Sequence, residues 1–215
     1  MEELYSRLAP VWDATLTVVG FKRGLCRYVI KNVAECGISK PKILDVGCGT
    51  GLVSFALLKN FPGSQVVATD LNEDMVKKTE ELARRQRIDK GRLTVGKADV
   101  LSQDTLILSD GTKLRLEPAS FDIVIASGVL EYTPIDKATP KLLGLLKDNG
   151  RLLIISMNEN SVGKLWGKMY KFDPIPKDQL EECLVQNGCR SVISSPLTLK
   201  EFPANVTRTG HVVTK

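Results

Sequence analysis

A glycine-rich segment is the part of this sequence whose residue types best suit ligand binding. Residues 43–51 read ILDVGCGTG, in which a short apolar run leads into three alternating glycines. Because glycine has no side chain, the backbone of such a turn can approach a ligand closely. In an open parallel sheet, ligands bind beyond the carboxyl ends of the strands, where this segment would lie. The segment therefore predicts a binding loop, with a plain strand-to-helix turn as the alternative.

Two acidic residues follow at the ends of the next two apolar runs. Asp70 stands 23 residues after Gly47, at a spacing where dinucleotide folds place a carboxylate that accepts ribose hydroxyls. Asn72 or Asp70 could cap the helical run that begins at Glu73, and for Asp70 this role is compatible with binding ribose. Asp99 could accept a hydrogen bond from an adenine amino group, with Val100 packed on the ring, or it could be a turn residue. The spacing favours a nucleoside ligand.

The glycine spacing narrows the choice of nucleoside. A pyrophosphate-binding turn has the pattern GxGxxG or GxGxxA, which needs Gly or Ala at position 52. This sequence has Leu52 instead, and its glycines follow the pattern GxGxG. We therefore predict a cofactor loop without the pyrophosphate fingerprint, which disfavours a nicotinamide-dependent oxidoreductase.

The elements that must position these residues alternate along the chain. Short apolar runs predict strands at 42–46, 65–69, 92–98, 121–126, 151–156, 189–194 and 211–214. Helical spacing predicts helices at 52–61, 73–87, 134–147 and 176–186, the third of them stopped by Asn149-Gly150. This alternation indicates an α/β fold with a doubly wound, mainly parallel, seven-stranded sheet. No helical pattern separates the last two strands, so we expect them to form an antiparallel pair at one edge.

The chain length of 215 residues suits a single domain. Residues 1–38 precede the first strand and have a helical pattern with breaks near Pro10 and Gly20, so we expect an N-terminal helical cap of the same domain. Residues 39–215 form the expected α/β binding domain. Residues 105–116 contain two short alternating runs around Asp110-Gly111, which predict a hairpin insertion between the third and fourth strands.

Composition excludes several classes of function. The five cysteines form no CxxC pair and the chain has one histidine, His211, so we predict no metal site and a structural role for His211. The formal net charge of +5 is mild and does not require a polyanionic partner. No apolar stretch approaches the roughly 18 residues of a membrane span, and acidic residues stand where a signal peptide would be basic. These features predict a reduced, cytoplasmic protein without a membrane span.

Several segments together carry a resemblance to a known family. ILDVGCGTG, VVATDLNEDM, KADV, and FDIVIASGVLEYTP followed by GRLLIISMN resemble the class I S-adenosylmethionine-dependent methyltransferases. Within them the chain is most similar to the small-molecule branch that includes the ubiquinone/menaquinone C-methyltransferase-like enzymes, whose N-terminal segment the run YSRLAPVWD also resembles. The similarity covers roughly residues 1–158. It implies a Rossmann-like methyltransferase fold and methyl transfer from S-adenosylmethionine to a small, hydrophobic or aromatic acceptor, with S-adenosylhomocysteine as product.

The resemblance also implies contacts with the methionine end of the cofactor. The backbone of Gly47, Cys48 and Gly49 would surround this end, and Cys48 would be a small apolar filler rather than a nucleophile. Asp45 would orient the loop. The backbone carbonyl of Ser127 would accept from the ammonium group.

Further contacts follow from the same resemblance. Tyr5 would reach the carboxylate of the methionine end. Asp70 would take the ribose hydroxyls. The adenine ring and its amino group would meet the side chains of Leu71, Met75, Asp99 and Val100.

The resemblance is weakest at the expected catalytic position. The loop after the fourth strand often carries a histidine in this branch, whereas here that position holds Tyr132. We therefore expect catalysis mainly by proximity, with Tyr132 or Glu131 positioning or deprotonating the acceptor. The alternatives are a packing aromatic at 132 and a solvated loop acid at 131.

Two segments could enclose the acceptor. One is the N-terminal cap, with Tyr5, Trp12 and Phe21. The other is residues 161–172, where Trp166 and Tyr170 have near-helical spacing. The predicted acceptor contacts are Trp12, Tyr132, Trp166 and Tyr170. Packing against the sheet is the alternative for each of these side chains.

Two other functions stay open beside this one. A cofactor-binding module without chemistry of its own would explain the missing histidine. An RNA methyltransferase is disfavoured, because aromatic residues make up 6% of the chain and offer no extended base-stacking platform. The loop after the fourth strand also lacks the Pro-Pro-aromatic pattern of enzymes that methylate amino groups of nucleic acids. Nucleic acid is therefore not an expected partner, and the sequence does not specify an oligomeric state.

Overall fold

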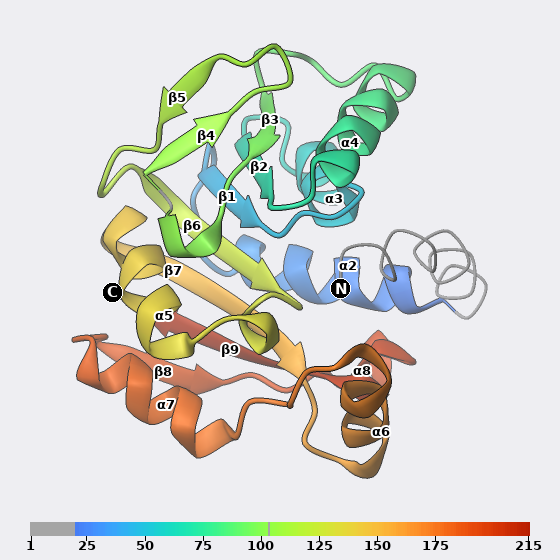
Figure 1. Ribbon diagram of the computed structural model, residues 1–215, viewed down its shortest axis with the longest axis vertical. Helices are drawn as coiled ribbons and strands as arrows, with labels where there is room; N and C mark the ends of the chain where they lie inside the picture. Colours follow the sequence, from blue (N-terminus) through green and yellow to red (C-terminus); the bar gives the residue numbers. More distant parts are fainter. Residues whose placement is uncertain (1–19, 103) are drawn as a thin grey trace.

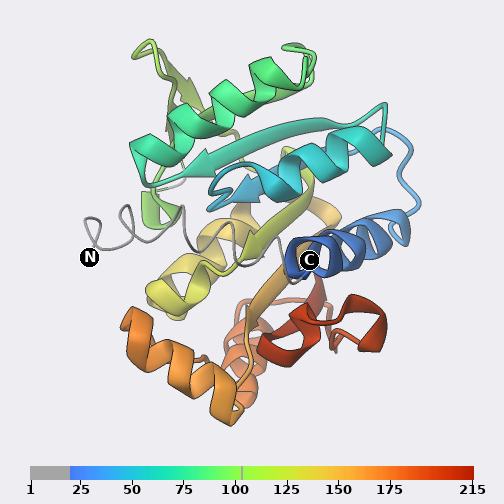
Figure 2. The same ribbon diagram turned by 90° about the vertical axis from the view of Figure 1, so that its right-hand side faces the viewer.

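The computed structural model describes residues 20–102 and 104–215. These residues form one twisted sheet with helices packed against it (Figures 1 and 2). Its strands are β1 (Lys42–Val46), β2 (Gln65–Asp70), β3 (Leu93–Lys97), β4 (Thr105–Ile107), β5 (Lys113–Arg115), β6 (Phe121–Ser127), β7 (Leu146–Met157), β8 (Ser191–Ser194) and β9 (Arg208–Thr214). They lie in the order β5-β4-β3-β2-β1-β6-β7-β9-β8. Tyr5 and Trp12 fall outside the described residues.

The five central strands, from β3 through β7 in the sheet order, are parallel. β9 runs antiparallel to both β7 and the edge strand β8. This arrangement confirms the predicted mainly parallel sheet with an antiparallel edge. The predicted hairpin is confirmed as the antiparallel pair β4 and β5, and because it joins the sheet, the described residues form nine strands rather than the expected seven. The first strand of the hairpin, β4, pairs with β3 at Lys97 and Ile107 and so extends the sheet.

Helices cover both faces of the sheet (Figures 1 and 2). They are α2 (Phe21–Ala34), α3 (Leu52–Asn60), α4 (Glu73–Arg85), α5 (Ile135–Leu145), α6 (Ser161–Tyr170), α7 (Lys177–Gln186) and α8 (Ala204–Thr207), with short 3₁₀ turns η1 (Val100–Ser102), η2 (Leu130–Tyr132) and η3 (Leu199–Glu201). Neighbouring residues of β1 face opposite layers. Ile43 packs in the cluster formed by α2 and α3, and Leu44 packs in the cluster formed by α5 and α7. Both are fully buried, which explains why the strand is apolar throughout.

Several predicted boundaries are wrong, including the start of the last strand at Arg208 rather than His211, and two differences alter the fold. The third predicted helix ends at Leu145 rather than near 147, because β7 begins at Leu146, which pairs with Phe121. Asn149 and Gly150 therefore lie inside a strand, at a register irregularity where Asn149 has a φ of +61°. The second difference is in the last connection, where η3 and α8 fill the segment that was expected to have no helix.

The N-terminal helix α2 belongs to the packed core. Phe21 is 8% exposed and lies in the same buried cluster as Leu57 and Ile123. It therefore packs against the sheet, which was the alternative to a contact with the acceptor. Tyr28 crosses to the far strands, where its hydroxyl donates to the carbonyl oxygen of Ser195 at 2.6 Å. The division of the chain at residue 38 stays a prediction.

Candidate functional site

The glycine loop lies at the carboxyl ends of β1 and β2. Gly47, Gly49 and Gly51 have φ values of +65°, +54° and +81°, a region that other residues adopt only with strain. A Cβ atom at Gly47 would collide with Val129, whereas one at Gly49 would meet no atom within 4 Å. The middle of the loop therefore has bare backbone facing open space, as a ligand-binding turn requires.

Asp70 ties this loop to the end of β2. Its Oδ2 accepts a hydrogen bond from the backbone N–H of Gly49 at 2.8 Å, and its Oδ1 accepts from Asn72 N–H at 2.9 Å. Burial raises the pKa of Asp70, and these hydrogen bonds oppose that rise. The cap of α4 is the side chain of Asn72, which accepts from the backbone of Asp74. The alternative of Asp70 as the helix cap is therefore wrong.

Thr79, which was not among the predicted site residues, holds the loop from the other side. Its hydroxyl donates to the carbonyl oxygen of Gly49 at 2.7 Å. Gly49 is thus fixed through its N–H by Asp70 and through its C=O by Thr79. The available signal was the position of this threonine, one turn after Met75 on the apolar stripe of α4, and the structure shows that Thr79 is fully buried there.

Asp45 lies in the buried strand immediately behind the loop. It is 1% exposed, and its Oδ2 accepts from the Ser54 hydroxyl at 2.6 Å. Burial raises the pKa of Asp45 to about 7, against the lowering effect of the Ser54 hydrogen bond, while the nearby charge of Asp70 adds to the rise. Ser54 was also missed, although a serine within the apolar run LVSFALL of α3 marks it.

Cys48 has the environment of a packing residue. It is 8% exposed and packs against Ala68, Val76 and Val95. Burial, with the nearby charges of Asp45 and Asp70, raises the pKa of its thiol well above the usual value. A thiol that stays protonated is a poor nucleophile, which supports the predicted filler role.

The residues expected around adenine lie at the ends of β2 and β3. Leu71 directly follows β2 and is 54% exposed, whereas Met75 and Val100 are buried. The Oδ1 of Asp99 accepts from the backbone N–H of Leu101 at 2.9 Å. The turn role considered for Asp99 is therefore present, and its other carboxylate oxygen is not part of that bond.

Glu131 is not in the solvated environment that was its alternative, while its role toward an acceptor stays a prediction. Its side chain is 1% exposed, so it is not a solvated loop acid. The Oε1 atom accepts from the backbone N–H of Met157 at 2.6 Å and lies 3.3 Å from Nη1 of Arg208. Glu131 therefore joins the loop after β6 to the adjoining ends of β7 and β9. No local pattern could have found Arg208, because its partner is 77 residues away.

Tyr132 lies beside the second segment predicted to enclose an acceptor. It is 48% exposed and meets Phe172 edge-on, with ring centroids 5.2 Å apart. Trp166 and Tyr170 stack on each other along α6, with centroids 5.5 Å apart. The structure thus brings Tyr132 into contact with Phe172, within residues 161–172, and the acceptor-binding role of these residues stays a prediction.

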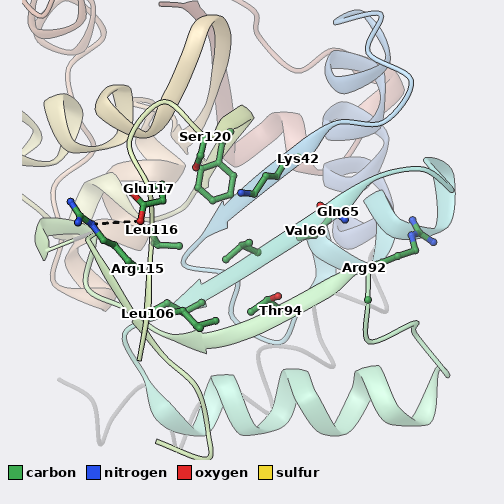
Figure 3. Close-up of a pocket in the computed structure, with 14 residues that line it drawn as sticks. Lys42, Gln65, Val66, Arg92, Thr94, Leu106, Arg115, Leu116, Glu117 and Ser120 are labelled. Atoms are coloured by element: carbon green, nitrogen blue, oxygen red, sulfur yellow. Dashed lines mark ion pairs between the residues drawn. The ribbon is translucent and has the colours of Figure 1, made fainter. Parts of the chain in front are cut away.

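A cavity of about 240 Å³ lies elsewhere, between the hairpin and the sheet (Figure 3). It is lined by Lys42 and Gln65, the first residues of β1 and β2, and by Leu106 and Leu116 from the hairpin segment. Because these strands start where the cavity lies, it is at the amino edge of the sheet. None of the predicted site residues lines it.

His211 and the possible metal-binding side chains of the described residues are the remaining polar features. His211, expected to be structural, is 1% exposed, and burial lowers its pKa. Within residues 20–102 and 104–215, no group of three His, Cys, Asp or Glu side chains is arranged to hold a metal ion. In the same residues, no helix has the length and apolar character needed to cross a membrane.

Comparisons with known proteins agree with this geometry. A family model described as "Methyltransferase domain" matches residues 44–152, slightly more than half of the chain. The chain is 33% identical over 132 residues to a ubiquinone biosynthesis O-methyltransferase of Idiomarina loihiensis, covering 61% of this chain and 48% of the relative. It is 30% identical over 138 residues to a ubiquinone/menaquinone biosynthesis C-methyltransferase of Cereibacter sphaeroides, covering 63% and 50%. The chain thus spans about half the length of these curated relatives.

A solved structure shows the same fold. Magnesium protoporphyrin IX methyltransferase from Synechocystis PCC 6803, crystallised with bound S-adenosylhomocysteine, aligns with a TM-score of 0.69 at 17% identity. The alignment covers 92% of this chain and 84% of that protein. The sheet and its helical layers are therefore those of a Rossmann-like methyltransferase.

Proposed function

Because the chain belongs to the methyltransferase domain family, we propose that it is an enzyme that transfers the methyl group of S-adenosylmethionine to a small acceptor. The names of the curated relatives, which refer to ubiquinone and menaquinone biosynthesis, support a hydrophobic or aromatic acceptor rather than a nucleic acid. The five cysteines are free thiols, which supports action in the reducing cytoplasm.

The observation that carries this proposal is the double fixation of Gly49. Asp70 and Thr79 hold its N–H and its C=O, and open space lies where its side chain would be. A loop held in this way presents backbone and carboxylate oxygens rather than a phosphate cradle. Such oxygens suit a ligand that carries a sulfonium and an ammonium group, so the residues present fit S-adenosylmethionine.

Each residue of the site then has a role in holding the cofactor. Gly47, Cys48 and Gly49 would surround the methionine end. Asp45, in the strand that leads into this loop, would orient the loop. The carbonyl of Ser127 would accept from the ammonium group, and Tyr5 would reach the carboxylate.

At the other end of the site, Asp70 would accept the ribose hydroxyls with lone pairs that its backbone hydrogen bonds do not use. Leu71, exposed in this structure, would cover one face of the adenine with Met75. Asp99 would accept from the adenine amino group, beside Val100.

The reaction needs alignment more than it needs a strong base. When bound, S-adenosylmethionine would supply an electrophilic methyl group. An electron pair of the acceptor would form the new bond to the methyl carbon, and the electrons of the broken carbon–sulfur bond would stay on the sulfur. Tyr132 and the stacked pair of Trp166 and Tyr170, with Trp12, would hold the acceptor in line and exclude water. The proton that the acceptor loses would pass to solvent, directly or through the Tyr132 hydroxyl, which would release its own proton as it accepts one. Glu131, whose Oε1 contacts Arg208 and the N–H of Met157, would act as a positioning residue rather than a base.

Titration calorimetry with S-adenosylhomocysteine tests the cofactor assignment. We expect micromolar binding by the unaltered protein, no comparable binding of NAD, and at least a tenfold loss of affinity in Asp70→Ala. Asp110→Ala is the matched control, because Asp110 also accepts a backbone N–H, from Thr112, but on the exposed hairpin. Equal affinity in Asp70→Ala and the unaltered protein would contradict the assignment. Binding of NAD in place of S-adenosylhomocysteine would contradict the whole proposal.

A further inference from the structure

Arg208 stands where an acceptor would approach. It is the first residue of β9 and pairs with Met157, the last residue of β7. Because β9 is antiparallel to its neighbour, its beginning lies at the carboxyl edge of the sheet, the same edge as the glycine loop. β9 is three strands from β1 in the sheet order, about 14 Å at the usual strand spacing. Arg208 therefore lies on the side of the site away from β2, where the adenosine end is expected.

The guanidinium group reaches back toward the end of β6. A Cβ atom at Gly128 would lie 3.6 Å from both Nη1 and Nη2 of Arg208. Gly128 directly follows Ser127, whose carbonyl is the proposed partner of the methionine ammonium group. The charge of Arg208 is thus next to the position proposed for the methionine end of the cofactor.

Glu131 contacts this guanidinium but leaves some of the N–H donors of Arg208 available for other partners. A guanidinium has five N–H donors, and a carboxylate can accept two of them side by side. Here Oε1 of Glu131 is shared between Nη1 of Arg208 and the N–H of Met157. Its Oε2 is buried and accepts no hydrogen bond within the described chain. In residues 20–102 and 104–215, Glu131 is the partner that the structure records for the Arg208 side chain, which keeps 18% of its surface exposed.

We propose that Arg208 binds an anionic group of the methyl acceptor, a carboxylate or a phosphate, and that Glu131 positions it. A fork of N–H donors held by one atom of a buried acid can receive such a group from the solvent side. The acceptor is then a small molecule with an anionic substituent beside its reactive atom. This inference rests on the proposed function and deepens it by naming the class of acceptor.

Binding of simple anions to the full chain loaded with S-adenosylhomocysteine tests the proposal. The probes are benzoate and inorganic phosphate, with benzamide as the uncharged match for benzoate. The side-chain Nε–Hε signal of Arg208 in ¹⁵N-labelled protein reports the contact, and its absence in Arg208→Lys assigns it. We expect benzoate and phosphate to shift this signal and benzamide to leave it in place.

Three variants sharpen the result. Arg208→Gln should weaken benzoate binding at least tenfold while S-adenosylhomocysteine affinity stays within twofold. Glu131→Gln keeps an oxygen for the N–H of Met157 but removes the competing negative charge, so benzoate should bind several-fold more tightly. Arg190→Gln, at an exposed arginine bonded to Asn149, should change neither affinity. Native near-ultraviolet circular dichroism confirms that each variant is folded.

Each other outcome has a distinct meaning. Unchanged benzoate binding in Arg208→Gln, or an Arg208 signal that anions do not move, would overturn the proposal. A parallel loss of S-adenosylhomocysteine affinity would overturn it too, and would assign Arg208 to the carboxylate of the cofactor. Failure of the unaltered protein to bind S-adenosylhomocysteine would instead contradict the proposed function, because the calorimetric control is independent of any anion.

Discussion

Asp45 is the residue at which the needs of the site and of the fold conflict. Its carboxyl group is buried in β1, where the Ser54 hydroxyl is its hydrogen-bond partner. With a folded-state pKa of about 7 and an ordinary value of 3.8, the folded protein holds this proton more tightly than the unfolded chain does. Stability contributed by this group is therefore greatest at low pH and falls as the pH rises from about 4 to 7. A cationic ligand nearby would favour the ionised form.

We expect Asp45→Asn to remove this pH dependence. The free energy of unfolding of the variant, relative to the unaltered protein, should rise between pH 4.5 and 7.5, by at most about 4 kcal/mol. Urea denaturation at four pH values in this range measures it. Asp110→Asn is the control, because the hydrogen bond from Thr112 lowers the pKa of exposed Asp110, away from this range. A difference between Asp45→Asn and the unaltered protein that does not vary with pH would show that the buried carboxyl group does not titrate there.

At the scale of elements, the crossing of α2 over β9 depends on one missing side chain. Gly210 lies in β9 directly beneath the Tyr28 ring, and a Cβ atom there would collide with the Tyr28 hydroxyl. The hydroxyl meanwhile donates to Ser195, in the chain that leaves β8. The contact joins α2 to the far edge of the sheet.

Gly210→Ala should therefore destabilise the protein by about 2–4 kcal/mol, because it displaces the Tyr28 ring and breaks its hydrogen bond. Gly144→Ala is the matched control. Gly144 is in α5, and an added Cβ there meets nothing within 4 Å, so this variant should gain about 0.5–1 kcal/mol. Thermal and urea unfolding measure both changes. A Gly210→Ala variant as stable as the unaltered protein would mean that Tyr28 moves aside without cost.

The elements that could be predicted from the sequence are those specified by local patterns. β1 was predicted to the residue, and α3 and α4 to within one or two, because an apolar run, glycines or a capping Asn72 mark their ends. The start of β7 could not be predicted, because its pairing with Phe121 depends on a strand 25 residues earlier that no local pattern reports. The dependence on long-range pairing also divides the site residues into those that a local pattern predicts and those that it does not. Asp70 has a motif spacing, whereas Arg208 is placed by the antiparallel return of the last strand.

For the molecule as a whole, the hairpin of β4 and β5 contributes a buried side chain to the main hydrophobic core. Leu106 of β4 is 1% exposed and lies in the same buried cluster as Leu44 and Val124 of the central strands. The hairpin is therefore continuous with the main core, although its sequence reads as an insertion.

Leu106→Ala should cost about 2–5 kcal/mol, as for a central core leucine. Ile107, the next residue, is 39% exposed, and Ile107→Ala should cost about 1 kcal/mol or less. Chemical denaturation of both variants tests this contrast. A small cost at both positions would mean that the hairpin folds as an appendage. Because the substitutions lie at the β3 edge of the sheet, S-adenosylhomocysteine affinity should change little in either variant.

The antiparallel direction of β9 has a practical consequence for experiments in which the protein is attached to a solid support. Arg208 begins this strand at the carboxyl edge, so its other end, with Lys215, lies at the amino edge, where the Lys215 backbone N–H donates to Gly150. A tether attached after Lys215 would leave the glycine loop facing the solution. Immobilised in this way on a sensor chip or resin, the protein would keep its ligand-binding edge accessible, and captured acceptors could be eluted without passing the support.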